Sequence, residues 1–353
     1  MRKQLGIVIL LFFAITSTLA CLATEQKNVI LVTFDGVRWK EVFYGIDAKI
    51  SGGKSGNIFY YLWADLDLKG VTLGNRFLGT EVKVTGPTAV SLPTYQNIML
   101  GKVQLSCLKN ECDRIKEETL PERIKRELNL NPLEVATIAS WDAIPRAVEH
   151  IEGSTFVNAG IQPIIDGTDD PELIRLNEAQ QKDPPTQWHW ARLDKHTMAQ
   201  ALRYLKAHKP RFLFVSLNDT DELGHLGKYE EYVETLKLYD IWLKELSDTL
   251  EQMGEYGKNT TLIVTTDHGR GEGDDWKHHA ASIPDSMYIW IYGQSPYTRG
   301  RDTRAKTGDG LISWLFSRPY SHIDLRPTLE VSIGLKPVSC FSCGKVIKEI
   351  TGE

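Results

Sequence analysis

The 353-residue sequence has no repeat, no low-complexity tract, no large excess of one charge and, beyond its first residues, no long hydrophobic run. A membrane-spanning helix needs about 20 apolar residues, so no transmembrane segment is predicted and we expect a soluble mature chain. The 41 Lys and Arg nearly balance the 46 Asp and Glu, without a basic stripe. This balance gives no support for a nucleic-acid-binding surface. No biased linker interrupts residues 24–353, which favours a single domain.

Cysteines are few, and their spacing is informative. Apart from Cys21, the sequence contains the close pairs Cys107/Cys112 and Cys340/Cys343. In an exported protein an even number of cysteines favours disulfides, here two local ones. A four-cysteine zinc site is the alternative, but only Cys340 and Cys343 have the spacing of a zinc knuckle.

The N-terminus predicts export. Two basic residues, Arg2 and Lys3, precede an apolar run over residues 5–15, and small residues follow up to Ala20. This is the pattern of a signal peptide cleaved near residues 20–23, which predicts a secreted or periplasmic protein. Cys21 also permits lipid attachment, although Thr18 stands where a lipoprotein signal carries an aliphatic residue.

Short, unalternating apolar runs predict strands buried on both faces of a parallel sheet. Helical periodicity separates several of them and is clearest over residues 229–253 and 194–208. The alternation predicts a doubly wound α/β fold with a mostly parallel sheet and helices on both faces. Surface loops are expected over residues 51–57, 166–185 and 300–310. The predicted strands are residues 28–34, 133–139, 211–217, 260–265 and 287–292.

Acids and histidines follow three of these strands. Asp35 follows the first strand, Asp221 and His225 follow the strand that ends near Leu217, and Asp267 and His268 follow the run that ends at Thr266. Ligands of open parallel sheets lie beyond the carboxyl ends of the strands, so these groups can converge. Carboxylates mixed with imidazoles suit zinc, or less selectively manganese, and they suffice for two ions.

Each of these residues also has an ordinary structural explanation. An aspartate at a strand end is commonly a helix cap or a turn former, and a lone loop histidine is usually solvated. The joint occurrence of D-x-x-G-H and D-H-G after separate strands favours the metal site.

Ser91 is the candidate nucleophile. Pro93 suits the first turn of a helix that continues to about Leu100, which places Ser91 at or just before the helix N-terminus. Free N–H groups there favour an anion such as phosphate. Without the metal-binding candidates, an N-cap would be the more common role of such a serine. No Ser-His-Asp triad or G-x-S-x-G motif is visible, whereas a metal ion could activate the hydroxyl.

Taken together, these residues resemble the alkaline phosphatase superfamily, most closely its nucleotide pyrophosphatase/phosphodiesterase-like branch. The resemblance covers nearly the whole mature chain. It is anchored by V-T-F-D-G at residues 32–36, S-L-P at 91–93, D-E-L-G-H at 221–225, D-H-G-R-G at 267–271 and I-D-L-R-P-T-L at 323–329.

The resemblance implies two metal sites. One ion would be held by Asp35, Ser91, Asp267 and His268, and the other by Asp221, His225 and a final histidine. The D-H-G-R-G…W-x-x-H arrangement selects His279 as that histidine, with His278 the nearest alternative and His322 a weaker one.

Asn110 is a further implication of the resemblance. It lies between Cys107 and Cys112, and its amide would donate to a nonbridging oxygen of the substrate. A neutral donor suits a diester better than a dianionic monoester. The ordinary alternative is a turn-forming asparagine.

Two departures narrow the expected chemistry. A sulfatase of the formylglycine type needs C/S-x-P-x-R, but the fifth position here is Tyr95, so that chemistry is not expected. The K-x-R pair of many monoesterases is also missing after the second predicted strand, where the chain reads S-W-D-A-I at residues 140–144. Arg146 or Lys102 could substitute for it.

The resulting expectation is an exported zinc-dependent phosphodiesterase that attacks phosphorus with Ser91 and forms a phosphoseryl intermediate. Alternatives are a phosphomonoesterase, a phosphonate hydrolase or a phosphomutase on the same site, and a metal-binding homologue without turnover. Trp188 and Trp190 could stack on a substrate ring, but core packing is the commoner use of tryptophan. The sequence indicates neither the natural substrate nor the oligomeric state.

Overall fold

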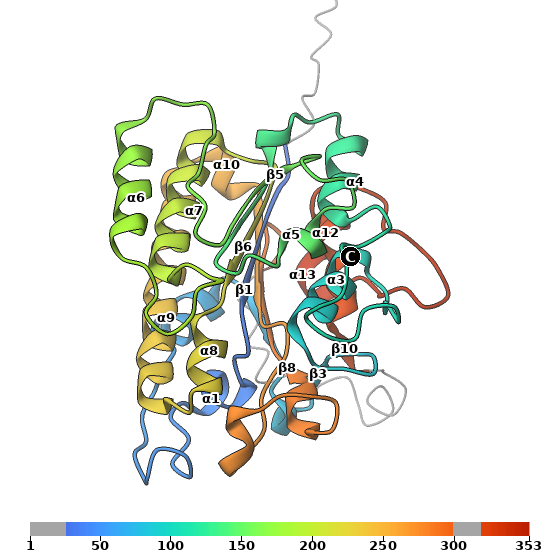
Figure 1. Cartoon of the computed structure of the whole chain (residues 1–353). Helices are drawn as coiled ribbons and strands as arrows, with labels where there is room; N and C mark the ends of the chain where they lie inside the picture. Colours follow the sequence, from blue (N-terminus) through green and yellow to red (C-terminus); the bar gives the residue numbers. More distant parts are fainter. Residues whose placement is uncertain (1–25, 299–318, 353) are drawn as a thin grey trace, which may run out of the picture.

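The computed structural model describes residues 26–298 and 319–352. The predicted signal peptide, Cys21 and the loop expected at residues 300–310 lie outside the described residues. A seven-stranded sheet in the order β2-β9-β7-β1-β6-β4-β5 forms the centre of the molecule (Figure 1). Its strands are β1 (Asn28–Phe34), β2 (Val71–Leu73), β4 (Val135–Ala139), β5 (Phe156–Ala159), β6 (Phe212–Leu217), β7 (Thr260–Thr265) and β9 (Ile291–Gln294).

The sheet is mostly parallel, as predicted. β1 pairs in parallel with both β6 and β7, while β9 pairs antiparallel with β7 and with β2. A smaller sheet in the order β10-β3-β8 lies beside it and consists of β3 (Val82–Lys83), β8 (Tyr288–Ile289) and β10 (Tyr320–Ser321).

Helices cover both faces of the central sheet (Figure 1). On one face, α7 and α9 pack over Ile30, Val32 and Phe34 of β1. On the other, α3, α4 and α12 pack over Val29 and Leu31, the alternate residues of the same strand. The helices are α1 (Trp39–Tyr44), α2 (Tyr60–Ala64), α3 (Ser91–Leu100), α4 (Leu120–Glu127), α5 (Pro145–Val148), α6 (Pro171–Lys182), α7 (Asp194–His208), α8 (Asp219–His225), α9 (Tyr229–Gln252), α10 (Glu255–Lys258), α12 (Leu325–Ser332) and α13 (Lys348–Thr351).

The strand prediction succeeded in the centre of the sheet because helices cover both faces of these strands. All seven residues of β1 and all six of β7 are buried, because helices lie on both sides of them. Side chains of a strand alternate between the two faces, so only a doubly covered strand can be apolar almost throughout.

Two predictions were wrong. The run over residues 287–292 is not one parallel strand but is divided between β8 and the antiparallel β9. The chain reaches it from the carboxyl end of β7 without a crossover helix, and only an antiparallel neighbour can be joined in that way. The expected loop over residues 166–185 contains α6, which begins at Pro171 and is capped by Asp170, whose side chain accepts the Glu172 N–H at 2.9 Å.

The cysteines form two local disulfides, Cys107–Cys112 and Cys340–Cys343, which confirms their expected pairing and argues against a four-cysteine zinc site. Within the two described ranges, no helix combines the length and the apolar character needed to cross a membrane.

Candidate metal centre and nucleophile

Three neighbouring strands bring the candidate residues together. β7, β1 and β6 lie side by side in the sheet, and their carboxyl ends meet at one edge. Asp35 follows β1 directly. The helix α8, which carries Asp221 and His225 one turn apart, follows β6, and Asp267 and His268 follow β7. None of these residues caps a helix by a side-chain hydrogen bond.

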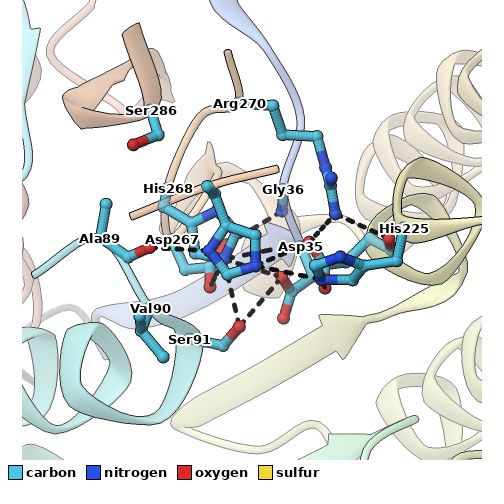
Figure 2. Close-up of polar contacts among 12 residues, drawn as sticks. Asp35, Gly36, Ala89, Val90, Ser91, His225, Asp267, His268, Arg270 and Ser286 are labelled. Carbon is cyan, nitrogen blue, oxygen red and sulfur yellow. Dashed lines mark hydrogen bonds and ion pairs between the residues drawn. The ribbon is translucent and has the colours of Figure 1, made fainter. Parts of the chain in front are cut away.

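The first cluster consists of Asp35, Asp267 and His268, which are all fully buried. His268 Nε2 lies 3.5 Å from Asp35 Oδ1 and 3.4 Å from Asp267 Oδ2. The hydroxyl of Ser91 reaches the same point: its Oγ lies 3.1 Å from His268 Nε2 and 3.4 Å from Asp35 Oδ1 (Figure 2). Four potential ligand atoms therefore surround one position.

The second cluster consists of Asp221, His225 and His279. His225 Nε2 lies 3.1 Å from Asp221 Oδ2 and 3.1 Å from His279 Nε2. Its members come from α8 and from the segment after β7, far apart in the sequence. Within each cluster the potential ligand atoms lie within 4.8 Å of one another.

The two clusters adjoin each other. The rings of His268 and His279 are stacked, with centroids 3.8 Å apart and an interplanar angle of 14°. His268 Nε2 also lies 4.0 Å from Asp221 Oδ1. The arrangement is therefore one continuous centre with two halves.

Hydrogen bonds to carbonyl groups orient both buried imidazoles. His268 Nδ1 lies 2.9 Å from the Gly269 carbonyl oxygen, and His279 Nδ1 lies 2.7 Å from that of Ala89. A carbonyl oxygen can only accept, so each Nδ1 carries the proton. Each Nε2 then directs a free lone pair into the cluster, which is the usual arrangement of a metal-binding histidine.

The pKa values of the two histidines also suit metal binding, which requires a neutral imidazole. Burial lowers the pKa of His268 to about 4 and that of His279 to about 3, so both rings are neutral at pH 7. Burial, together with the neighbouring Asp221 carboxylate, raises the pKa of Asp267 to about 7. The pKa of Asp35 is raised well above its usual range by burial and by Asp267 and Asp221. Buried carboxylates raise each other's pKa in this way when cations are missing.

The centre therefore has the chemistry of a cation site. Within the described part of the chain, the buried Oδ2 of Asp267 has no hydrogen-bond donor. Such an atom is costly to leave unsatisfied. A divalent cation would satisfy it and would offset the mutual repulsion of the carboxylates. The donor set of carboxylate oxygens, imidazole nitrogens and a hydroxyl suits zinc or manganese.

Sequence reasoning missed one member of the centre, Arg270. This buried guanidinium forms an ion pair with Asp221 and donates to the Asp221 carbonyl oxygen at 2.7 Å and to the Lys277 carbonyl oxygen at 2.8 Å. Burial acts to raise the pKa of Asp221, but the guanidinium beside it holds this pKa well below its usual range. Arg270 stands next to the D-H-G motif, but its contacts with α8 are visible only in the folded chain.

Two glycines make room for this ion pair. A Cβ added at Gly36, which has a φ of +64°, would lie 2.4 Å from Asp221 Oδ1. A Cβ at Gly224 would lie 2.4 Å from Arg270 Cζ. Both positions therefore need glycine for steric reasons, and Gly36 also because of its left-handed backbone.

Ser91 is the first residue of α3, and Val90 occupies the N-cap position without a side-chain cap. The alternative role of Ser91 as the N-cap does not hold, because its hydroxyl contacts the first cluster instead. The positive dipole end of α3 lies beside the hydroxyl and favours an anionic group there.

The remaining candidates lie in different surroundings. Asn110 lies in the Cys107–Cys112 loop, and its Oδ1 accepts the Leu92 N–H at 3.0 Å. His278 is exposed. His322 is buried away from both clusters, and its Nδ1 accepts the Thr85 N–H at 3.1 Å. Of the three candidate histidines, the structure therefore brings only His279 into the centre.

A pocket of about 410 Å³ opens onto the centre. This volume is in the range of small-molecule sites. The pocket is lined by Ser91, Asn110, Trp141, Trp190, Asn218, Asp221, Glu222 and His225.

Comparison with known proteins agrees with this picture. The model of the Metalloenzyme superfamily matches residues 147–309, a segment that includes Asp221, His225, Asp267, His268 and His279. A stretch of 90 residues is 33% identical to GPI ethanolamine phosphate transferase 1 of Emericella nidulans. That match covers 24% of this chain and spans only 9% of the fungal protein.

Solved structures share the fold at low identity. A 2-O GAG sulfatase superimposes with a TM-score of 0.59 at 13% identity, over 93% of this chain and 75% of that one. Phosphonate monoester hydrolase of Agrobacterium radiobacter gives 0.56 at 14% identity, over 92% and 77% of the two chains. A protein in the alkaline phosphatase superfamily from Vibrio parahaemolyticus gives 0.53 at 13% identity, over 88% and 67%.

At these identities the structural likeness shows the fold, while the family model matches residues 147–309, which carry five of the candidate ligands. Residues 147–309 are thus similar to the metalloenzyme superfamily, and the chain has the alkaline phosphatase-like fold.

Proposed function

We propose that this protein is an exported phosphodiesterase that uses Ser91 as its nucleophile and two divalent metal ions, zinc in the first instance. The observation that carries the proposal is the position of the Ser91 hydroxyl. It lies at a helix N-terminus, contacts both Asp35 and His268, and faces the pocket.

The two clusters would hold one ion each. Asp35, Ser91, Asp267 and His268 would hold the first, and Asp221, His225 and His279 the second. When bound, such ions supply Lewis acidity, which lowers the pKa of the serine hydroxyl and stabilises negative charge on the phosphoryl and leaving oxygens.

Ser91 Oγ would attack phosphorus, forming a new P–O bond while the bond to the leaving alcohol breaks. The resulting phosphoseryl ester would then be hydrolysed by water, which regenerates the hydroxyl. The N-terminus of α3 would orient the phosphoryl oxygens during both displacements. Positioning and electrostatics supply most of the rate in phosphoryl transfer.

Asn110 favours a diester substrate. Its Oδ1 is occupied by the Leu92 N–H, so its Nδ2 group is the part that can donate to a substrate oxygen. Within the described ranges, the residues that line the pocket include no Lys or Arg. A neutral donor without a cationic clamp suits the single negative charge of a phosphodiester better than the two charges of a monoester.

Tyr95 supports phosphoric over sulfuric esters. It replaces the arginine of the formylglycine motif, and its buried hydroxyl lies 3.3 Å from Asp35 Oδ2. The name of the fungal relative also refers to a phosphoric ester, ethanolamine phosphate.

The two disulfides support export, because such bonds persist in oxidising compartments. We further propose that residues 24–353 form one catalytic domain. The central sheet joins strands from β1 to β9, and the C-terminal α12 packs with α3 in one of the two cores.

A substrate panel tests this function. The protein would be stripped of metal, then assayed with and without added zinc or manganese on bis-p-nitrophenyl phosphate, p-nitrophenyl phosphate, a p-nitrophenyl phosphonate and p-nitrophenyl sulfate. We expect zinc-dependent hydrolysis, with kcat/KM highest for the diester. Higher values for the monoester or the phosphonate would reassign the substrate class, and no metal-dependent hydrolysis of any ester would overturn the proposal.

A further inference from the structure

Three residues of one wall of the pocket, Trp141, Trp190 and Glu222, have no role in the proposed ester hydrolysis. Besides Ser91, Asn110, Asn218 and the metal-cluster residues Asp221 and His225, the pocket is lined by two tryptophans, Trp141 and Trp190, and by the carboxylate of Glu222. Glu222 belongs to neither metal cluster. Trp141, Trp190 and Glu222 share this pocket with the Ser91 hydroxyl, so an ester arm of a bound phosphodiester could reach them.

Trp190 is unusually exposed for so large an apolar side chain. Its exposed fraction is 46%, whereas Trp188, two residues earlier, is 4% exposed and belongs to the interior. Trp190 Nε1 donates to Glu222 Oε1 at 2.9 Å, which fixes the indole at the pocket edge. Its exposed ring face is therefore available to a ligand.

The backbone around this wall is held firmly. Trp141 forms an isolated antiparallel bridge with Ala191, and the Asp142 N–H donates to the Trp190 carbonyl oxygen at 3.0 Å. Next to them, the buried Arg192 side chain donates to Asn158 Oδ1 at 2.6 Å, and also to Thr197, Gln180 and the Ala139 carbonyl oxygen. The two indoles are thus presented by a preorganised segment.

The charge of the wall indicates what it can bind. Glu222 Oε1 accepts the Trp190 N–H and, at 3.5 Å, the Asn218 amide, and no Lys or Arg of the described chain lines the pocket. A positively charged group placed between the indole faces and this carboxylate would gain cation–π attraction as well as charge pairing. A neutral sugar or base could stack on the indoles but would gain neither the cation–π attraction nor the charge pairing with Glu222.

We propose that Trp141, Trp190 and Glu222 form a subsite for an alkylammonium group, so that the substrate is a phosphodiester of an amino alcohol or of its quaternary ammonium analogue. This inference rests on the proposed phosphodiesterase function and names its substrate class. Both kinds of ammonium group share the same chemistry, and separate arms of the experiment distinguish them.

The test compares two matched diesters. One is the p-nitrophenyl phosphodiester of choline, and the other is its neutral carbon isostere, in which a tert-butyl group replaces the trimethylammonium group. The ethanolamine diester and the p-nitrophenyl diester of thymidine complete the set. We expect kcat/KM to be about tenfold higher for a cationic diester than for the isostere, mainly through a lower KM.

Variants assign the preference to the wall. Trp190→Leu keeps an apolar side chain but removes the aromatic face, and Glu222→Gln removes the charge. Each is expected to lower the ratio of the two kcat/KM values several-fold. Tyr60→Leu and Glu178→Gln are the controls, since both side chains are exposed on other helices, α2 and α6. They should leave the ratio unchanged.

The outcomes separate this inference from the proposed function. Zinc-dependent hydrolysis with equal kcat/KM for the cationic diester and its isostere, or a preference for the thymidine diester, would overturn the ammonium subsite and leave the phosphodiesterase in place. If no diester is hydrolysed, titration of the protein with choline, followed by tryptophan fluorescence, still tests the subsite. A saturable change that Trp190→Leu abolishes would support it, and no change in the unaltered protein would overturn it.

Discussion

Gly224→Ala is predicted to destabilise the protein even though alanine is the better helix former. In the last turn of α8, the added Cβ would lie 2.4 Å from Cζ, 2.5 Å from Nε and 2.7 Å from Nη1 of Arg270. The guanidinium cannot easily move away, because it donates to the carbonyl oxygens of Asp221 and Lys277 and pairs with the Asp221 carboxylate.

The two opposing effects differ in size. Replacing glycine by alanine within a helix stabilises a protein by about 0.5–1 kcal/mol. Overpacking a buried site by one methyl group costs about 1–3 kcal/mol. The steric effect is therefore expected to win, with a net loss of about 1 kcal/mol, and the displaced guanidinium should also weaken metal binding through Asp221.

The double-mutant cycle with Arg270→Ala isolates the cause. Without the guanidinium the three atoms nearest to the new methyl group are gone, so Gly224→Ala should become stabilising by about 0.5–1 kcal/mol in that background. Urea unfolding of the metal-free proteins, followed by tryptophan fluorescence, measures all four free energies. The packing argument fails if Gly224→Ala changes the stability by the same amount in both backgrounds, or if it stabilises the otherwise unaltered protein.

Three further predictions concern the centre and the stability of the chain. His279→Ala should lower the zinc content by about one ion per chain, whereas His278→Ala should retain the full content by elemental analysis; the reverse would exchange their roles. Asn110→Asp keeps the acceptor for the Leu92 N–H but removes the amide donor, so kcat/KM for a diester should fall roughly 100-fold with no change in melting temperature; an unchanged kcat/KM would refute the donor role. Ion pairs and hydrogen bonds hold the pKa of Asp166 well below its usual range. The ionised carboxylate therefore stabilises the folded protein above about pH 4, and this contribution is lost as the pH falls further. Asp166→Asn should therefore lower the free energy of unfolding by about 3 kcal/mol at pH 7 and by less at pH 3; a difference independent of pH would contradict this.

The central part of the fold could be predicted because its strands are buried on both faces. β1 and β7 are apolar runs whose limits agree with the prediction, and α7 has the expected boundaries. The orientation of β9 could not be predicted, because it depends on the route of the chain after β7. Asp170 and Pro171 are a recognisable start for the helix α6, but the many polar residues around them led to the prediction of a loop.

The candidate site shows the same division between local and long-range information. Asp35 and Asp267 could be placed because each directly follows a strand. Arg270 could not, because its partner Asp221 is far away in the sequence. Trp188 and Trp190 have similar local sequences, but Trp188 is buried and Trp190 is exposed at the pocket. The backbone next to Trp190 pairs with Trp141, a contact that the local sequence does not reveal.

The central claim is that Ser91 is the nucleophile, and detection of the covalent intermediate tests it most directly. The zinc-loaded protein would be mixed with a p-nitrophenyl phosphodiester, quenched in acid, digested and analysed by mass spectrometry. We predict a phosphoester adduct on the peptide that contains Ser91, and no adduct and no turnover for the folded Ser91→Ala variant. An adduct on another residue, or near-normal turnover by Ser91→Ala, would contradict the account.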